Sequence, residues 1–106
     1  MAASFANAQT LPVPERGKSY VVRDLSGKAI ERLVSENAQF RIVAAPGQER
    51  RTGWAKRRGT QLVFYDEAGR VTGAARQELL PPDAPISAMA TVRDPLGNPI
   101  GFLTRY

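Results

Sequence analysis

The 106-residue chain contains no cysteine and no histidine. The absence of cysteine excludes disulfides, thiolate metal sites and cysteine nucleophiles. The absence of histidine excludes Ser-His-Asp and Cys-His catalysis, the usual zinc sites and a switch at physiological pH. The side chains left for chemistry are those of Asp, Glu, Lys, Arg, Tyr, Ser and Thr, and no motif focuses them. We therefore expect neither an enzyme nor a cofactor or metal site.

Long apolar runs are also missing. No run approaches the roughly 18 residues that a membrane-spanning helix needs, so no membrane span is expected. Apolar residues make up 42% and charged residues 24% of the chain, which is typical of a folded domain. The 9 glycines and 8 prolines favour short strands and loops over long helices.

The charge balance is basic, with 15 Lys and Arg residues against 10 Asp and Glu residues and a net charge of +5. Such an excess favours contact with phosphate, acidic polysaccharide or an acidic protein surface. It also serves the solubility of a small domain, whatever its partner. Both interpretations stay open at this point.

Three strings of the form Asp-x-x-Gly punctuate the chain, and each is followed by a polar residue. They run from Asp24 to Gly27, from Asp66 to Gly69 and from Asp94 to Gly97, and a fourth glycine, Gly47, follows Pro46 without an Asp. Asp caps such a turn with its side chain, and Gly accepts the positive φ that closes a hairpin. One carboxylate per turn does not supply a calcium site. The strings therefore predict structural turns that close sequential hairpins.

The segments between these turns are strand-like, for example 19–25, the alternating run 40–44, the apolar run 62–65, and 86–93 with 100–105. Two segments stay open between strand and short helix. In 28–36 the apolar residues also follow helical spacing, and 74–80 ends before Pro81-Pro82. The fold class expected is mainly β, with sequential hairpins forming a small barrel or sandwich and up to two short helices at 28–36 and 74–80.

Residues 1–18 predict an extended, proline-containing N-terminal tail, and residues 19–106 a single β-rich domain. The string Ala6-Asn7-Ala8 has the small-x-small form of a signal-peptidase site. If residues 1–8 are the remnant of a signal peptide, the protein is secreted or periplasmic. Otherwise it belongs to the cytoplasm or a virion.

The string Tyr65-Asp66-Glu67-Ala68-Gly69-Arg70-Val71-Thr72 resembles the core of RHS/YD repeats, and Asp94-Pro95-Leu96-Gly97-Asn98 is similar to a string that alternates with it. The resemblance covers about residues 62–76 and 91–105. Repeats of this kind form β-hairpin arrays on bacterial secreted and toxin proteins. The resemblance implies hairpins and a structural role, although the spacing in this chain is irregular.

The most basic stretch of the chain runs from position 50 to position 58 and contains the only tryptophan. Guanidinium groups bind phosphate or carboxylate with paired hydrogen bonds, and an aromatic face stacks on a base or sugar ring. Alternatively, the charges protect an edge strand and the tryptophan is buried in the core. The candidate anion-binding residues are Arg50, Arg51, Trp54, Lys56, Arg57 and Arg58.

Two functions follow from these features. The first is a non-catalytic binding or assembly module of bacterial or phage type, which acts on a protein partner or on copies of itself through its surface and its tail. The second is a polyanion-binding protein that uses the basic ridge 50–58 for nucleic acid or acidic polysaccharide.

Overall fold

The computed structural model describes residues 18–45, 53–76 and 78–105 of the chain. These residues form β-strands joined by turns and loops. The strands are β1 (Ser19–Asp24), β2 (Ala29–Glu36), β3 (Gln39–Ala44), β4 (Gly53–Arg58), β5 (Gln61–Asp66), β6 (Val71–Arg76), β7 (Ala88–Arg93) and β8 (Pro99–Arg105).

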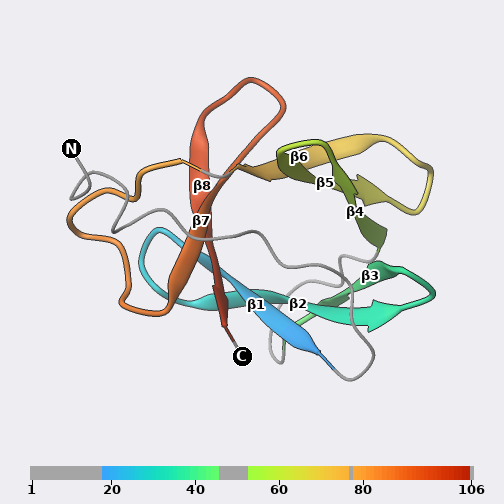
Figure 1. Cartoon of the computed structure of the whole chain (residues 1–106), viewed down its shortest axis with the longest axis horizontal. Helices are drawn as coiled ribbons and strands as arrows, with labels where there is room; N and C mark the ends of the chain where they lie inside the picture. The colour runs from blue at the N-terminus through green and yellow to red at the C-terminus, as the bar shows by residue number, and fades with distance from the viewer. Residues whose placement is uncertain (1–17, 46–52, 77, 106) are drawn as a thin grey trace.

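The eight strands form one closed antiparallel barrel in which each strand pairs with its neighbours in sequence (Figure 1). The barrel closes where Tyr20–Asp24 of β1 pairs with Gly101–Arg105 of β8. The prediction of sequential hairpins in a small barrel is therefore confirmed. The predicted tail, apart from Lys18, lies outside the described residues.

The helical alternative is wrong for both open segments. Ala29–Glu36 is strand β2, and the first part of 74–80 belongs to β6, while 78–80 has no regular structure. Strand β2 pairs with β1 along one edge and with β3 along the other. These two ladders satisfy its backbone groups and outweigh helix propensities of only a few tenths of a kcal/mol per residue. In the part of the chain that the structure describes, no helix could cross a membrane.

Two short turns close hairpins without an Asp-x-x-Gly string. Between β2 and β3, Asn37 and Ala38 both adopt positive φ angles, of 51° and 62°, which is the conformation of a type I′ turn. Between β4 and β5, Gly59 takes the positive φ, at 61°. The first of these turns lacks glycine, and the sequence signals used above did not predict it.

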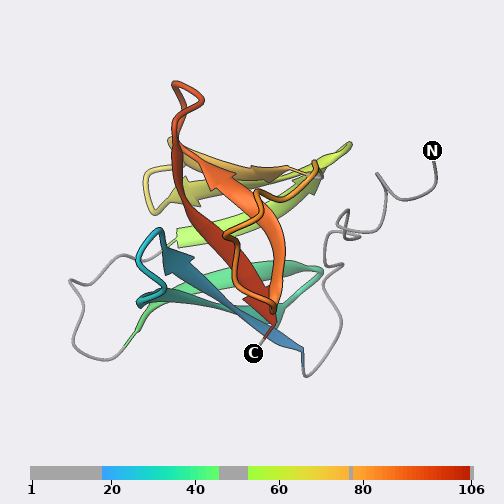
Figure 2. The same ribbon diagram turned by 90° about the vertical axis from the view of Figure 1, so that its left-hand side faces the viewer.

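The two ends of the barrel differ in their turns. Because the strands run up and down, the turns after β1, β5 and β7 lie at one end. In Figure 2 the β1–β2 and β5–β6 turns lie on the left-hand side, and the β7–β8 turn projects at the top. The β2–β3 and β4–β5 turns lie on the right-hand side. We call the first end, with the turns 24–28, 66–70 and 94–98, the Asp-turn end.

The interior of the barrel is filled by alternate side chains of every strand. Tyr20 meets Phe40 edge to face, with ring centroids 5.6 Å apart. Burial of each large apolar side chain stabilises the fold by about 1.5–3 kcal/mol, so this interior is the main source of stability. The largest fully buried side chains of this interior are Phe40, Leu33, Leu62, Leu103, Val22 and Val92.

Each of the three Asp-x-x-Gly hairpins contains a β-bulge six residues after its Asp. The extra residues are Ile30, Thr72 and Ile100, which lie opposite no single partner in the preceding strand. A bulge bends its strand and turns a side chain in a new direction. The hairpins are therefore three copies of one local structure, and all three bulges lie near the Asp-turn end.

The long connection between β6 and β7 lies against the outside of the barrel. Leu79 and Pro81 line a hollow of about 430 Å³ together with Phe102 of β8. Glu78 anchors the connection through an ion pair with Arg93, at 3.1 Å. This loop explains why Phe102, although it faces away from the barrel interior, is only 6% exposed.

Candidate functional site

Strand β4 divides the basic stretch between two directions. Ala55 is fully buried in the core, and alternation along a strand therefore turns Trp54, Lys56 and Arg58 to the outer surface of the barrel. Arg57 shares the direction of Ala55, is exposed at the end of β4, and its Nε donates a hydrogen bond of 3.4 Å to the carbonyl oxygen of Gly59. Arg50 and Arg51 lie outside the described residues.

Trp54 lies directly opposite Tyr65 of β5 in the ladder. Both side chains are half-buried, so the tryptophan belongs to the outer surface and not to the core. Lys56 Nζ lies 6.0 Å from the centroid of the Tyr65 ring, and the guanidinium carbon of Arg58 lies 5.9 Å from it. Each cation–π contact at an exposed site contributes about 0.5–1 kcal/mol. The tyrosine ring therefore holds two cations beside the tryptophan.

The neighbouring strands extend this surface with two further arginines. Arg41 of β3 lies opposite Trp54 in the ladder, and its Nε is 3.6 Å from a carboxylate oxygen of Glu36. On the other side, Gln61 pairs with both Arg58 and Arg76. Cross-strand neighbours share one face of the sheet. We define the basic-aromatic face as Arg41, Trp54, Lys56, Arg58, Tyr65 and Arg76.

A hollow of about 450 Å³ opens beside the tryptophan, between β3 and β4. Its lining includes Trp54, Arg41 and Glu67 as well as other residues of both strands. The two strands pair over only three positions here. The hollow thus places an aromatic ring, a cation and a carboxylate around one space.

The basic-aromatic face differs from the predicted ridge in its members. Trp54, Lys56 and Arg58 belong to it, whereas Arg57 points elsewhere. Sequence reasoning missed Arg41, Tyr65 and Arg76, because these residues come from other strands and only the ladder registers bring them beside β4. The alternation of 62–65 was the one available signal, since it places Tyr65 and Val63 on the same face.

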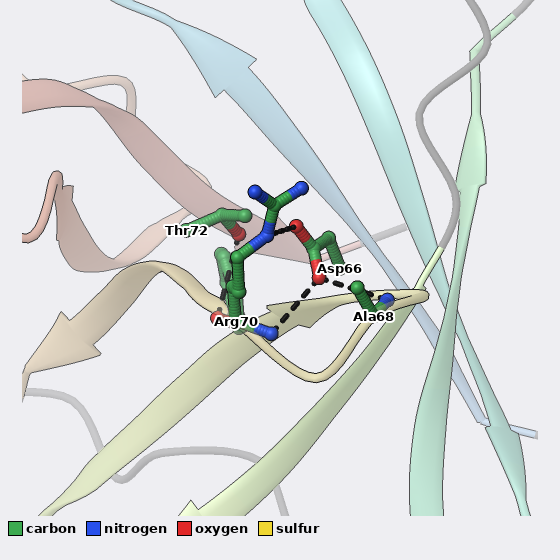
Figure 3. A network of polar contacts seen from close by, with 5 residues as sticks. Asp66, Ala68, Arg70 and Thr72 are labelled. Carbon is green, nitrogen blue, oxygen red and sulfur yellow. Dashed lines mark hydrogen bonds and ion pairs between the residues drawn. The ribbon is translucent and has the colours of Figure 1, made fainter.

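The predicted turn residues adopt the predicted conformation wherever the structure describes them. Asp66 Oδ1 accepts hydrogen bonds from the backbone N–H groups of Ala68 and Arg70, both at 2.9 Å, as Figure 3 shows. Asp24 and Asp94 make the equivalent bonds in their own turns. Gly27, Gly69 and Gly97 have φ angles of 91°, 83° and 91°. Gly47 lies outside the described residues.

Hydrogen bonds lower the pKa values of the three turn carboxylates. The pKa of Asp66 is lowered chiefly by the hydrogen bond from the Arg70 backbone, and that of Asp94 by the bond from the Asn98 backbone. The side-chain bond from Ser26 is the largest cause of the lowered pKa of Asp24. Hydrogen bonds to the charged form stabilise it. With a lowered pKa, each of these three carboxylates stays ionised to a lower pH than a free aspartate does.

Metal-ligating side chains do not gather in the described ranges 18–45, 53–76 and 78–105, where no group of three Asp, Glu, His or Cys residues could hold an ion. Instead, the Oδ1 atoms of the turn carboxylates accept hydrogen bonds from backbone N–H groups. Each such turn is complete without a metal.

Comparisons of the chain with protein-family models, with curated proteins and with solved structures found no match. The resemblance to RHS/YD repeats therefore stays a prediction. Its two strings coincide with the β5–β6 and β7–β8 hairpins, which is the local structure that the resemblance implies.

Proposed function

We propose that the protein is a non-catalytic binding module that takes polyanions, nucleic acid or acidic polysaccharide, on its basic-aromatic face. The observation that carries the proposal is the pairing of Trp54 with Tyr65 beside the side chains of Lys56 and Arg58. Surfaces that bind charged chains combine cations for the backbone with aromatic rings for stacking. Here the barrel ladder holds both kinds of side chain on one face.

The charges of this face support an anionic ligand. Lys56 and Arg58 of β4 and Arg76 of β6 are exposed, and β5 lies between these two strands. Residues two apart on a strand lie about 7 Å from each other, and neighbouring strands lie about 4.8 Å apart. Cations spread over such distances suit successive anionic groups of an extended chain better than a single small anion. Arg41 contributes a further cation, although its exposed ion pair with Glu36 has to be exchanged at a cost of less than about 1 kcal/mol.

Among polyanions, the hollow beside Trp54 favours single-stranded nucleic acid. A base stacked on an aromatic side chain gains about 1–3 kcal/mol. Every base has a π-face that can stack in this way, whatever the sequence of the strand. The ranking we propose is therefore single-stranded nucleic acid above sulfated polysaccharide.

The test is a titration with single-stranded DNA, RNA and heparin at two or more salt concentrations, followed by the fluorescence of Trp54. This is the only tryptophan of the chain, so the signal comes from the face itself. Affinity should fall as salt rises, and the double variant K56Q/R58Q should bind more weakly. If both residues contact phosphate, the log–log salt slope becomes shallower by about 1.4, at roughly 0.7 per contact to a single strand.

A matched control removes two positive charges elsewhere. Lys28 and Arg70 both belong to turns at the Asp-turn end, so K28Q/R70Q lowers the net charge equally and leaves the face intact. The control should keep most of the affinity and the full salt slope. Equal losses in both double variants, or no salt-dependent binding by the unmodified protein, would contradict the proposal.

Assembly through the surface and the tail is the first of the two functions that the sequence predicts, and it stays a prediction. Residues 1–17 lie outside the described part, and each of the eight described strands pairs on both sides in the closed barrel. A partner strand therefore has no open edge to pair with among the described strands. Removal of residues 1–17 should abolish oligomers if the tail drives assembly, and light scattering would measure the change.

A further inference from the structure

A hollow lies between the outside of the barrel and the loop that follows β6. It has a volume of about 430 Å³, and its described lining combines residues of that loop with residues of β7, β8 and the β1–β2 turn. Small-molecule sites are concave, mostly apolar and about 300–1,000 Å³ in volume. The apolar residues of the described lining are Leu25, Leu79, Leu80, Pro81, Pro99 and Phe102.

Two leucines of this lining are largely exposed to solvent. Leu25, in the β1–β2 turn, is 58% exposed, and Leu79, in the loop, is 57% exposed. Phe102 of β8, which lines the same hollow, is only 6% exposed. A ligand seated in the hollow would remove part of both leucine side chains from water, which favours binding.

A buried threonine in the hollow has a hydroxyl group without a hydrogen-bond partner. Among the described residues two threonines are buried, Thr91 of β7 at 3% exposure and Thr104 of β8 at 0%. Thr104 donates to the Val21 carbonyl oxygen at 2.9 Å. Thr91, which lines the hollow, has no partner at Oγ1. A buried hydroxyl normally has a partner, because an unpaired one destabilises the fold, so the exception at Thr91 requires an explanation.

The surroundings of Thr91 suit an uncharged aromatic ligand. Thr91 lies opposite Phe102 in the β7–β8 ladder, and cross-strand neighbours share one face of the sheet. Arg93, two residues further along β7, is paired with Glu78 at 3.1 Å. Asp83, the third charged residue of the described lining, is exposed. The unpaired hydroxyl thus lies beside an aromatic ring, and the nearest charge on its own strand already has a partner.

We propose that this hollow binds a small uncharged molecule with an aromatic body and one hydroxyl group. The ring packs against Leu25, Leu79 and Phe102, and the hydroxyl pairs with Thr91, which can both donate and accept a hydrogen bond. Because the Thr91 oxygen is covered, the ligand reaches it when the loop 78–81, which has no regular structure, moves outward. No residue of the described lining belongs to the basic-aromatic face, so this site does not depend on the proposed polyanion function.

The test is a fluorine NMR titration of the full chain with para-fluorophenol and para-fluorotoluene, two uncharged probes that differ only in a hydroxyl and a methyl group. Both should bind with affinities in the millimolar range. The change T91V should weaken para-fluorophenol roughly two- to tenfold, the loss expected for one hydrogen bond, and leave para-fluorotoluene unchanged. Without a probe, T91V should have the same Tm as the unmodified protein or a higher one, because it removes an unpaired hydroxyl.

A second pair of variants tests the place of the ring. The change L79A removes an apolar side chain of the lining and should weaken both probes. The matched control L96A removes a leucine that is 87% exposed in the β7–β8 turn and lies outside the lining, so both affinities should stay the same. The proposal is overturned if neither probe binds, if T91V affects both probes equally or has a lower Tm, or if L96A weakens binding as much as L79A does.

Discussion

Replacement of Gly101 by alanine should disrupt the closure of the barrel. Gly101 lies in β8 beside β1, and a Cβ atom at this position would come within 2.1 Å of the backbone oxygen of Arg23 and 3.1 Å of its carbonyl carbon. Cβ atoms essentially never approach another heavy atom more closely than 3.0 Å. Because the obstructing atoms belong to the backbone, no side-chain rotation can relieve the contact.

The magnitude follows from what has to move. The contact must open from 2.1 Å to at least 3.0 Å, but β8 also pairs with β7 on its other side. Overpacking by one methyl group costs about 1–3 kcal/mol, and each ladder hydrogen bond that lengthens or breaks adds about 1 kcal/mol. We therefore expect G101A to lose about 3 kcal/mol or more of a total of roughly 5–15 kcal/mol.

The assay is thermal unfolding followed by circular dichroism, with urea unfolding as a second measurement. A loss of this size lowers Tm by roughly 12 °C or more in a domain of about 100 residues. The matched control is G97A in the same hairpin. Gly97 has a φ of 91° but no neighbour within 4 Å of the added carbon, so its cost is only the backbone strain of about 1–2 kcal/mol. Equal Tm losses in the two variants would refute the close approach of β8 to β1.

Three other predictions concern the turns and the core. The lowered pKa of Asp66 means that the stability it contributes is complete above its unfolded-state pKa of about 3.9 and is lost as pH falls through the lower folded-state value. Asp66→Asn, which keeps the Oδ1 acceptor, should weaken this acid dependence in melts at several pH values, and an unchanged profile would contradict it. Phe40→Ala removes a fully buried ring and should cost about 3–5 kcal/mol in urea unfolding; a loss below about 1 kcal/mol would exclude Phe40 from the core. Thr104→Val removes a buried hydroxyl that donates to the Val21 carbonyl oxygen at 2.9 Å and should cost about 1 kcal/mol, whereas a more stable variant would show that this bond contributes nothing.

The hairpin turns were predictable because their interactions are local. The Asp side chain, the positive φ of the glycine and the N–H groups they satisfy all lie within five consecutive residues, for example Asp66 to Arg70. Such bonds form in the same way wherever the hairpin lies in a fold. The β2–β3 turn escaped prediction because Asn37 and Ala38 adopt positive φ without the usual glycine.

The functional surfaces were only partly predictable. Alternation along β4 correctly separates Trp54 from Ala55, but it does not show that Tyr65 lies opposite Trp54 or that Arg41 lies on its other side. Those neighbours depend on registers between strands. Likewise, Gly53, Gly73 and Gly101 lie opposite the buried residues Ile42, Phe64 and Val92, which no single segment of the sequence reveals.

By itself, then, the sequence determined the class of the fold, the places of the three Asp turns and the basic character of one strand. The tertiary structure decided that 28–36 is a strand, that the sheet closes and which side chains share each face. The physical reason is the range of the interactions. A turn is stabilised by bonds within a few residues, whereas closure pairs Tyr20 with Arg105, at opposite ends of the described chain, and only the packing of the whole interior selects that register.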